Sequence, residues 1–375
     1  MREDNTARLT LSDAELSNTI YQPLHPDVRP HLDPEYVAFH DRYLQYVEPD
    51  DVRPWDSVGT RQRVPFPPGT SAPVPVRAVK DIELANCTVR AFWPSESDEG
   101  RRRRPVAGWP VLVWYHGGGW AIGGIQSEND FCTRMCSDAN CVVVTVGYRL
   151  APEHPYPAAV DDALEALVWV NSEQGRRELD IDNTRIAIGG TSAGGNLSLA
   201  TSLKASLLQP PIRPIFQLLV VPVIDNTATT ATIWASRPHA PWLTPARMTW
   251  YRSMYLTNSS DATNWDASPN LAPPELLRNL PPTWMGVAEQ DVLAPEALRF
   301  ADQVRAVRGS GSNSGSGLDV EVELYPGMTH TILAMNGILS KGKKLVNDAG
   351  QVLQKAFTRD TAMTSEPSSA TQTPS

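Results

Sequence analysis

The chain has 375 residues, with 33 basic and 42 acidic side chains and a net charge of −9 at pH 7. This length accommodates one α/β core with an added cap, and the negative charge argues against nucleic acid or an anionic membrane as a general partner. No stretch approaches ~18 continuous apolar residues and no apolar segment follows the charged N-terminus, so we expect neither stable membrane insertion nor a signal peptide.

The predicted elements alternate between strands and helices. Residues 1–80 are rich in proline and charge and contain one helix-like patch at 34–44. A strand near 87–93 opens the core, and helical patterns such as 158–170 follow. Four further strands lie near Val111, Val142, Ile186 and Gln217. This alternation predicts an α/β fold with a mostly parallel, twisted sheet and helices on both faces.

A glycine-rich segment follows the strand-like run at 110–115 and reads His-Gly-Gly-Gly-Trp at 116–120. The tetrahedral intermediate of ester hydrolysis carries a negative oxygen, and backbone N–H groups must already point at it. Only glycine lets the chain come that close. The segment therefore predicts an oxyanion hole, with Trp120 in the adjoining substrate pocket. The expected oxyanion residues are Gly117, Gly118 and Gly119, with Gly118 and Gly119 as donors.

Residues 190–194 read Gly-Thr-Ser-Ala-Gly between a strand-like run and a helix-like segment. This is the context of a nucleophile elbow, a turn so sharp that Gly190 and Gly194 must present almost no side chain. Ser192 Oγ would lie at a helix N-terminus, where the helix dipole favours a developing anion. We expect Ser192 to be the nucleophile and the Ala193 N–H to be a third oxyanion donor.

The chain order Ser, Asp or Glu, His is typical of a triad on this type of sheet. A strand-like segment at 282–288 ends at Glu289-Gln290-Asp291, and a run with period-two alternation precedes His330. Both follow strand ends, where an open α/β sheet places its site. We expect His330 to exchange a proton with Ser192 and Asp291 to orient the imidazole, with Glu289 as the alternative acid.

The chain resembles the hormone-sensitive-lipase family of α/β-hydrolases in these motifs. It also shares Tyr-Arg-Leu-Ala-Pro-Glu-His-Pro at 148–155 and Gly-Met-Thr-His at 327–330. The similarity runs from about 84 to 353. It implies a helical cap and carboxylester hydrolysis without metal or cofactor, on short to medium acyl chains. Two departures bear on the alcohol side of the pocket. Pro295 stands where relatives usually carry a second acid, and Thr331 follows the histidine in place of glycine.

The resemblance also divides the chain. We expect 1–80 to contribute to the cap, 81–226 and 281–357 to form the hydrolase core, 227–280 to be the cap insertion, and the Ser/Thr/Pro-rich 358–375 to be disordered. The cap insertion contains four tryptophans that belong either to its core or to the acyl pocket. They are Trp234, Trp242, Trp250 and Trp265.

Four cysteines lack histidine partners at zinc-site spacing, so we expect buried free thiols in a reducing compartment, the cytoplasm. They are Cys87, Cys132, Cys136 and Cys141. The expected partner is a small-molecule ester, and the expected state is a monomer or homodimer.

Three hypotheses follow. The first is a serine carboxylesterase that cleaves a small, largely apolar ester through an acyl-enzyme. The second uses the same triad in a biosynthetic, secondary-metabolite pathway, as a deacylase, acyltransferase, offloading or cyclising hydrolase. The third is a non-catalytic ligand receptor like the plant gibberellin receptors, but those lack the triad histidine that is present here as His330. The sequence does not separate the first two, because they differ in water access and cap shape.

Overall fold

The computed structural model describes residues 19–62, 69–96, 104–309 and 320–363. An eight-stranded sheet with the order β1-β2-β4-β3-β5-β6-β7-β8 forms its centre. β2 pairs antiparallel with both β1 and β4, and all the other neighbours pair in parallel. The predicted mostly parallel α/β architecture is therefore confirmed.

The strands are β1 (Ala78–Glu83), β2 (Thr88–Trp93), β3 (Trp109–Tyr115), β4 (Val142–Gly147), β5 (Ile181–Thr191), β6 (Phe216–Val220), β7 (Thr283–Ala288) and β8 (Val320–Tyr325). Every residue of β3, β6 and β7 is buried, as expected for parallel strands covered on both faces. β2 does not open the core as we expected, because β1 precedes it. β1 is an edge strand whose only buried residue is Ile82, so its sequence carries little apolar alternation.

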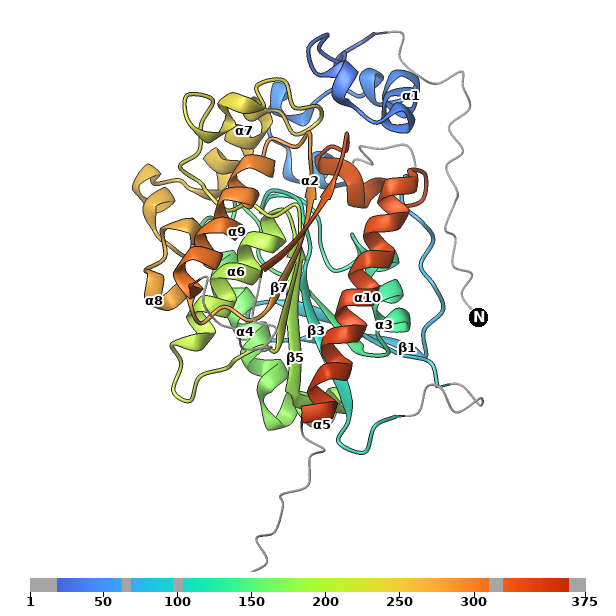
Figure 1. Cartoon of the computed structure of the whole chain (residues 1–375), viewed down its shortest axis with the longest axis vertical. Helices are drawn as coiled ribbons and strands as arrows, with labels where there is room; N and C mark the ends of the chain where they lie inside the picture. Colours follow the sequence, from blue (N-terminus) through green and yellow to red (C-terminus); the bar gives the residue numbers. More distant parts are fainter. Residues whose placement is uncertain (1–18, 63–68, 97–103, 310–319, 364–375) are drawn as a thin grey trace, which may run out of the picture.

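Helices cover both faces of the sheet (Figure 1). One face carries α3 (Asn129–Asp138) and α10 (Ser340–Met363), and the other carries α4 (Ala158–Asn171), α6 (Ala193–Ser206) and α9 (Ala294–Arg308). The shorter α5 (Glu173–Leu179) and α8 (Pro274–Leu277) flank the second group. The 3₁₀ helices are η1 (Arg29–His31), η2 (Leu44–Tyr46), η3 (Asp50–Val52), η4 (Ile233–Ser236), η5 (Ser259–Thr263), η6 (Pro269–Leu271) and η7 (His330–Met335).

The remaining helices lie together at one end of the molecule, at the top of Figure 1. They are α1 (Pro34–Arg42), α2 (Ser57–Gln62) and α7 (Pro245–Tyr255). α1 and α2 come from the N-terminal segment and α7 from the predicted cap insertion. Two stretches far apart in the chain thus cover the same end of the sheet.

α10 continues six residues beyond the boundary predicted at 357. Phe357, at the predicted boundary, is buried against the core, and the helix continues beyond it because each further residue adds a helical hydrogen bond. The rest of the predicted tail, 364–375, lies outside the described residues. The domain boundaries remain predictions.

All four cysteines are buried and none of them forms a disulfide, as predicted. Within the described ranges, no helix combines the length and the apolar character that a membrane crossing requires.

Candidate active site

Ser192 lies in the turn between β5 and α6, with φ 55° and ψ −116°. The turn is possible because of its glycines: a Cβ on Gly194 would overlap the Tyr115 carbonyl, and one on Gly190 would overlap the backbone of Gly194. The Ser192 N–H donates to the Val220 carbonyl at 2.9 Å, which fixes the turn to the end of β6. The serine is therefore held in a strained backbone conformation by its surroundings.

The three residues predicted as a triad meet in space, although the two contacts span 138 and 39 positions of the chain. His330 Nε2 lies 2.9 Å from Ser192 Oγ, and His330 Nδ1 lies 2.7 Å from Asp291 Oδ2. Asp291 is 1% exposed, and its other oxygen accepts the Leu293 N–H at 3.1 Å. These contacts form a continuous line of hydrogen bonds from a buried carboxylate to a serine hydroxyl.

Glu289, the alternative acid, makes a different contact. Its Oε2 accepts the Gly327 N–H at 2.8 Å, in the turn that leads from β8 towards the histidine. Glu289 thus supports the loop that carries His330, whereas Asp291 contacts the imidazole itself.

The glycine segment after β3 lines the same cavity as Ser192 and His330. Gly118 has φ 121° and Gly119 has φ 57°, conformations that favour glycine. Within the described part of the chain, the N–H groups of Gly118, Gly119 and Ala193 have no acceptor. These three groups are available to a ligand in the cavity.

Gly117 requires a correction, because its N–H is already used. It donates to Glu128 Oε1 at 3.0 Å, so Gly117 cannot also act as an oxyanion donor through that group. Glu128 Oε2 accepts the Trp114 indole N–H at 2.6 Å. Burial raises the pKa of Glu128 to about 7, although both hydrogen bonds favour the ionised form. Sequence reasoning missed this carboxyl group, since nothing local links position 128 to 117.

Trp120 requires a second correction. It is wholly buried, its ring stacks on Tyr255 with centroids 4.3 Å apart, and it is not among the residues that line the cavity. Its backbone has φ 59°, a left-handed conformation. The aromatic ring that borders the cavity next to the glycines belongs instead to Tyr251 of α7, which leaves no room for a Cβ on Gly119.

The cavity has a volume of about 220 Å³ and a mostly apolar lining. Its cap side comes from α7 and the loop before it, and consists of Trp242, Leu243, Arg247, Met248 and Tyr251. Trp242 is the one of the four cap tryptophans that lines this cavity. The others lie elsewhere; Trp234, for example, donates its indole N–H to Glu296 Oε2 at 2.9 Å.

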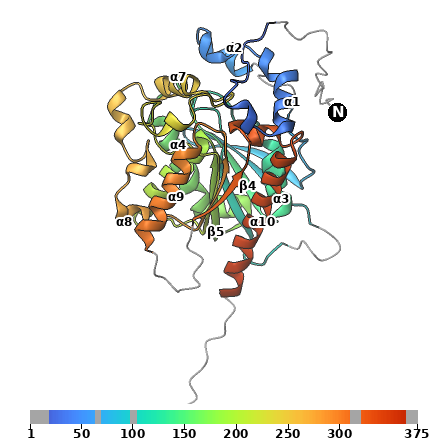
Figure 2. The ribbon, with the colours of Figure 1, turned by 45° about the horizontal axis from the view of Figure 1, so that its top comes forward.

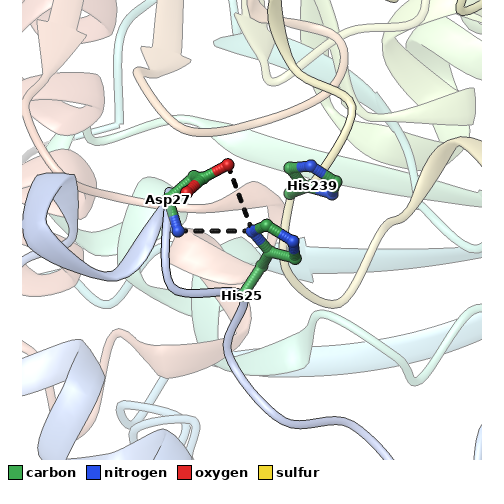
Figure 3. Close-up of side chains that lie close together, drawn as sticks. All are labelled: His25, Asp27 and His239. Carbon is green, nitrogen blue, oxygen red and sulfur yellow. Dashed lines mark hydrogen bonds and ion pairs between the residues drawn. The ribbon is translucent and has the colours of Figure 1, made fainter.

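Among the described residues, one group brings three potential metal ligands within 4.8 Å of one another: His25, Asp27 and His239 (Figure 3). All three are exposed, and the two imidazole rings stack with centroids 3.5 Å apart. The group joins the N-terminal segment to the loop before α7 and is separate from the cavity that contains Ser192.

Comparison with known proteins shows which family the chain belongs to. Residues 112–334 match the family model described as the α/β hydrolase fold. An AB hydrolase superfamily protein of Schizosaccharomyces pombe, C1039.03, is 38% identical over 343 residues, which cover 89% of this chain and 97% of that protein. The carboxylesterase NlhH of Mycobacterium tuberculosis is 34% identical over 249 residues, which cover 66% of this chain and 71% of that enzyme.

Among solved structures, an α/β-hydrolase enzyme from the metagenome of Lake Arreo, Spain, aligns with a TM-score of 0.74 at 27% identity. The alignment covers 88% of this chain and 99% of that one. The chain belongs to the α/β-hydrolase family. Within that family it is an enzyme of the carboxylesterase type, as its sequence predicted.

Proposed function

We propose that this enzyme hydrolyses a small, largely apolar carboxylic ester through an acyl-enzyme. The observation that carries the proposal is the hydrogen-bonded line from Asp291 through His330 to Ser192, with distances of 2.7 and 2.9 Å. Relatives named as carboxylesterases support the same reaction class.

In this mechanism, Ser192 Oγ attacks the ester carbonyl and His330 Nε2 accepts its proton. Asp291 keeps the other ring nitrogen protonated and stabilises the imidazolium that forms. Negative charge develops on the carbonyl oxygen, close to the N-terminus of α6, whose dipole favours an anion. The donors assigned to that charge are the N–H groups of Gly118, Gly119 and Ala193.

His330 then returns the proton to the departing alkoxide, which leaves the acyl group on Ser192. A water molecule repeats the sequence in reverse, with His330 again as the base, and releases the carboxylic acid. The apolar lining and volume of about 220 Å³ favour a small acyl or alcohol group over a long one. A cytoplasmic location and a monomeric or homodimeric state remain expectations from the sequence.

The test is covalent labelling by a p-nitrophenyl phosphonate, followed by mass spectrometry of the peptide that contains position 192. We expect stoichiometric labelling of the wild type and loss of both labelling and p-nitrophenyl butyrate hydrolysis in Ser192→Ala. Ser206→Ala, in the last turn of the same helix, is the matched control and should label normally. Undiminished labelling of Ser192→Ala would refute the proposal.

The same assay distinguishes hydrolysis from acyl transfer. With methanol or butanol added at rising concentration, a hydrolase releases mainly the free acid, whereas a transferase releases mainly the new ester. Dominant ester formation at low alcohol concentration would favour the biosynthetic alternative.

A further inference from the structure

Arg247 is a buried cation in the wall of the catalytic cavity. It lies in the first turn of α7 and is 5% exposed. Its Nε donates to Asp51 Oδ1 at 2.9 Å, and its Nη2 donates to Gln22 Oε1 at 3.0 Å. The guanidinium carbon lies 4.9 Å from the centre of the Trp242 ring. Three segments of the chain thus fix the position of this side chain.

These contacts use only part of the donor capacity of Arg247. A guanidinium has five N–H groups in a rigid, planar arrangement. Among the residues that the structure describes, Arg247 Nη1 has no hydrogen-bond acceptor. Because Arg247 lines the catalytic cavity, these remaining N–H groups are available to a ligand there, and a hydrogen bond to a charged donor is stronger than one between neutral groups.

Arg247 also borders a second cavity of about 320 Å³. This cavity is lined by the N-terminal segment and the loop before α7. Helices α1 and α7, which adjoin these two segments, lie at the end of the molecule that comes forward in Figure 2. Trp242 and Arg247 line both cavities. A substrate whose ester lies at Ser192 can therefore extend towards this pair of side chains.

The charges around Arg247 indicate which ligand chemistry fits. Asp51 already compensates the positive charge, and its side chain is only 13% exposed. A substrate carboxylate would bring a second anion next to this buried one, whereas a neutral carbonyl oxygen would accept the free N–H groups without that repulsion. Leu243 and Met248 of the same wall provide apolar contacts for the intervening chain.

We propose that Arg247 is a specificity-determining residue that binds a second, neutral carbonyl oxygen of the substrate. The preferred substrates are accordingly keto esters or diesters, apolar except for the reacting ester and this second carbonyl. This inference rests on the proposed function, because it places the reacting ester at Ser192.

The experiment uses matched pairs of substrates with the full-length enzyme. p-Nitrophenyl alkanoates are compared with oxo-alkanoates of equal chain length whose keto group is moved stepwise along the chain. A parallel series varies the alcohol of acetate esters in the same way. For one position of the keto group, in one of the two series, we expect kcat/KM to be about 10-fold higher than for the ester of equal length without the keto group. A hydrogen bond to a charged donor accounts for a gain of this size. A terminal carboxylate should give no gain.

Two variants test whether Arg247 binds the second carbonyl of the substrate or only stabilises the fold. Arg247→Met should abolish the oxo preference. Asp51→Asn breaks the ion pair but keeps the free N–H groups, so it should retain the oxo preference and newly favour the terminal carboxylate. If Arg247→Met does not fold, the response of Asp51→Asn to the carboxylate substrate decides the question.

Two results would overturn the inference: an oxo preference below 2-fold throughout both series, or a preference that survives in Arg247→Met. Hydrolysis of the plain alkanoates that depends on Ser192 would leave the proposed function intact in either case. Hydrolysis that survives in Ser192→Ala would instead reject the proposed function itself.

Discussion

Glu128 Oε1 accepts the backbone N–H of Gly117 at 3.0 Å, and its other oxygen accepts the Trp114 indole N–H at 2.6 Å. The carboxyl group thereby fixes the start of the glycine segment to β3. The Gly117 N–H is therefore engaged, and the N–H groups of Gly118 and Gly119 are those that the proposed mechanism assigns to the oxyanion. Because the proposed mechanism places an oxyanion next to this buried acid, we expect Glu128 to affect both the rate and its pH dependence.

Glu128→Gln provides one oxygen for two N–H donors, so it loosens either Gly117 or Trp114. We expect a reduction of about 10-fold in kcat with little change in KM, because the oxyanion forms only in the transition state. Burial raises the pKa of Glu128 to about 7. The wild type therefore acquires a negative charge near the oxyanion above this pH, and the variant does not.

The ratio of variant to wild-type kcat should consequently rise from pH 6 to pH 9. Stopped-flow measurement of p-nitrophenyl ester hydrolysis over this range gives the ratio directly. A ratio that stays constant would mean that the carboxylate charge does not act on the transition state.

Gly119→Ala should be far more damaging than Gly124→Ala. A Cβ on Gly119 would overlap the Tyr251 ring, and the backbone there has φ 57°, which costs roughly 1–2 kcal/mol for a residue other than glycine. A Cβ on Gly124 would meet only the end of the Gln126 side chain, at 3.3 Å. We expect kcat/KM to fall at least about 10-fold in the first variant and less than about 2-fold in the second. Equal losses of kcat/KM in the two variants would show that the substrate does not contact the backbone at Gly119.

Asp291→Asn should reduce kcat by about 10⁴-fold, because an amide in this position favours the wrong histidine tautomer. Glu289→Gln should cost less than about 10-fold, since Glu289 contacts the Gly327 N–H and not the imidazole. Steady-state kinetics of the two variants side by side test the assignment. The reverse order of severity would identify Glu289 as the acid.

We expect Glu296 to make the free energy of unfolding depend on pH. Its carboxylate accepts N–H groups from Ile224, Asp225 and Trp234, yet burial prevails and raises its pKa from 4.5 to about 8. Above pH 4.5 the unfolded chain releases this proton while the folded chain keeps it. The unfolded state then binds fewer protons, so this contribution to stability falls as pH rises from 4.5 to about 8, by about 1.4 kcal/mol for each pKa unit of difference.

Urea unfolding at pH 5, 6.5 and 8 measures this slope. Glu296→Gln should reduce it, whereas the control Glu275→Gln on the exposed surface of α8 should leave it unchanged. An undiminished slope in Glu296→Gln would assign the pH dependence to other groups.

The sequence predicted correctly those turns whose backbone conformation depends on local steric contacts. The turn at 190–194 follows from glycines that leave no room for a Cβ, and the glycines after β3 follow from positive φ angles. Continuous apolar runs predicted the central strands for a similar reason, since a strand buried on both faces has mostly apolar residues. β1 escaped prediction because an exposed edge strand imposes no such pattern.

The sequence by itself determined which residue types stand at the ends of the strands, and with them the class of enzyme. Only the tertiary structure decided that Asp291 rather than Glu289 contacts His330, that Glu128 occupies the Gly117 N–H, and that Tyr251 borders the cavity in place of Trp120. Asp291 and Glu289 are similar groups only two positions apart, so the sequence cannot show which of them reaches the histidine. The other two contacts depend on distances between separate segments of the chain, and the packing of the sheet and the cap sets those distances.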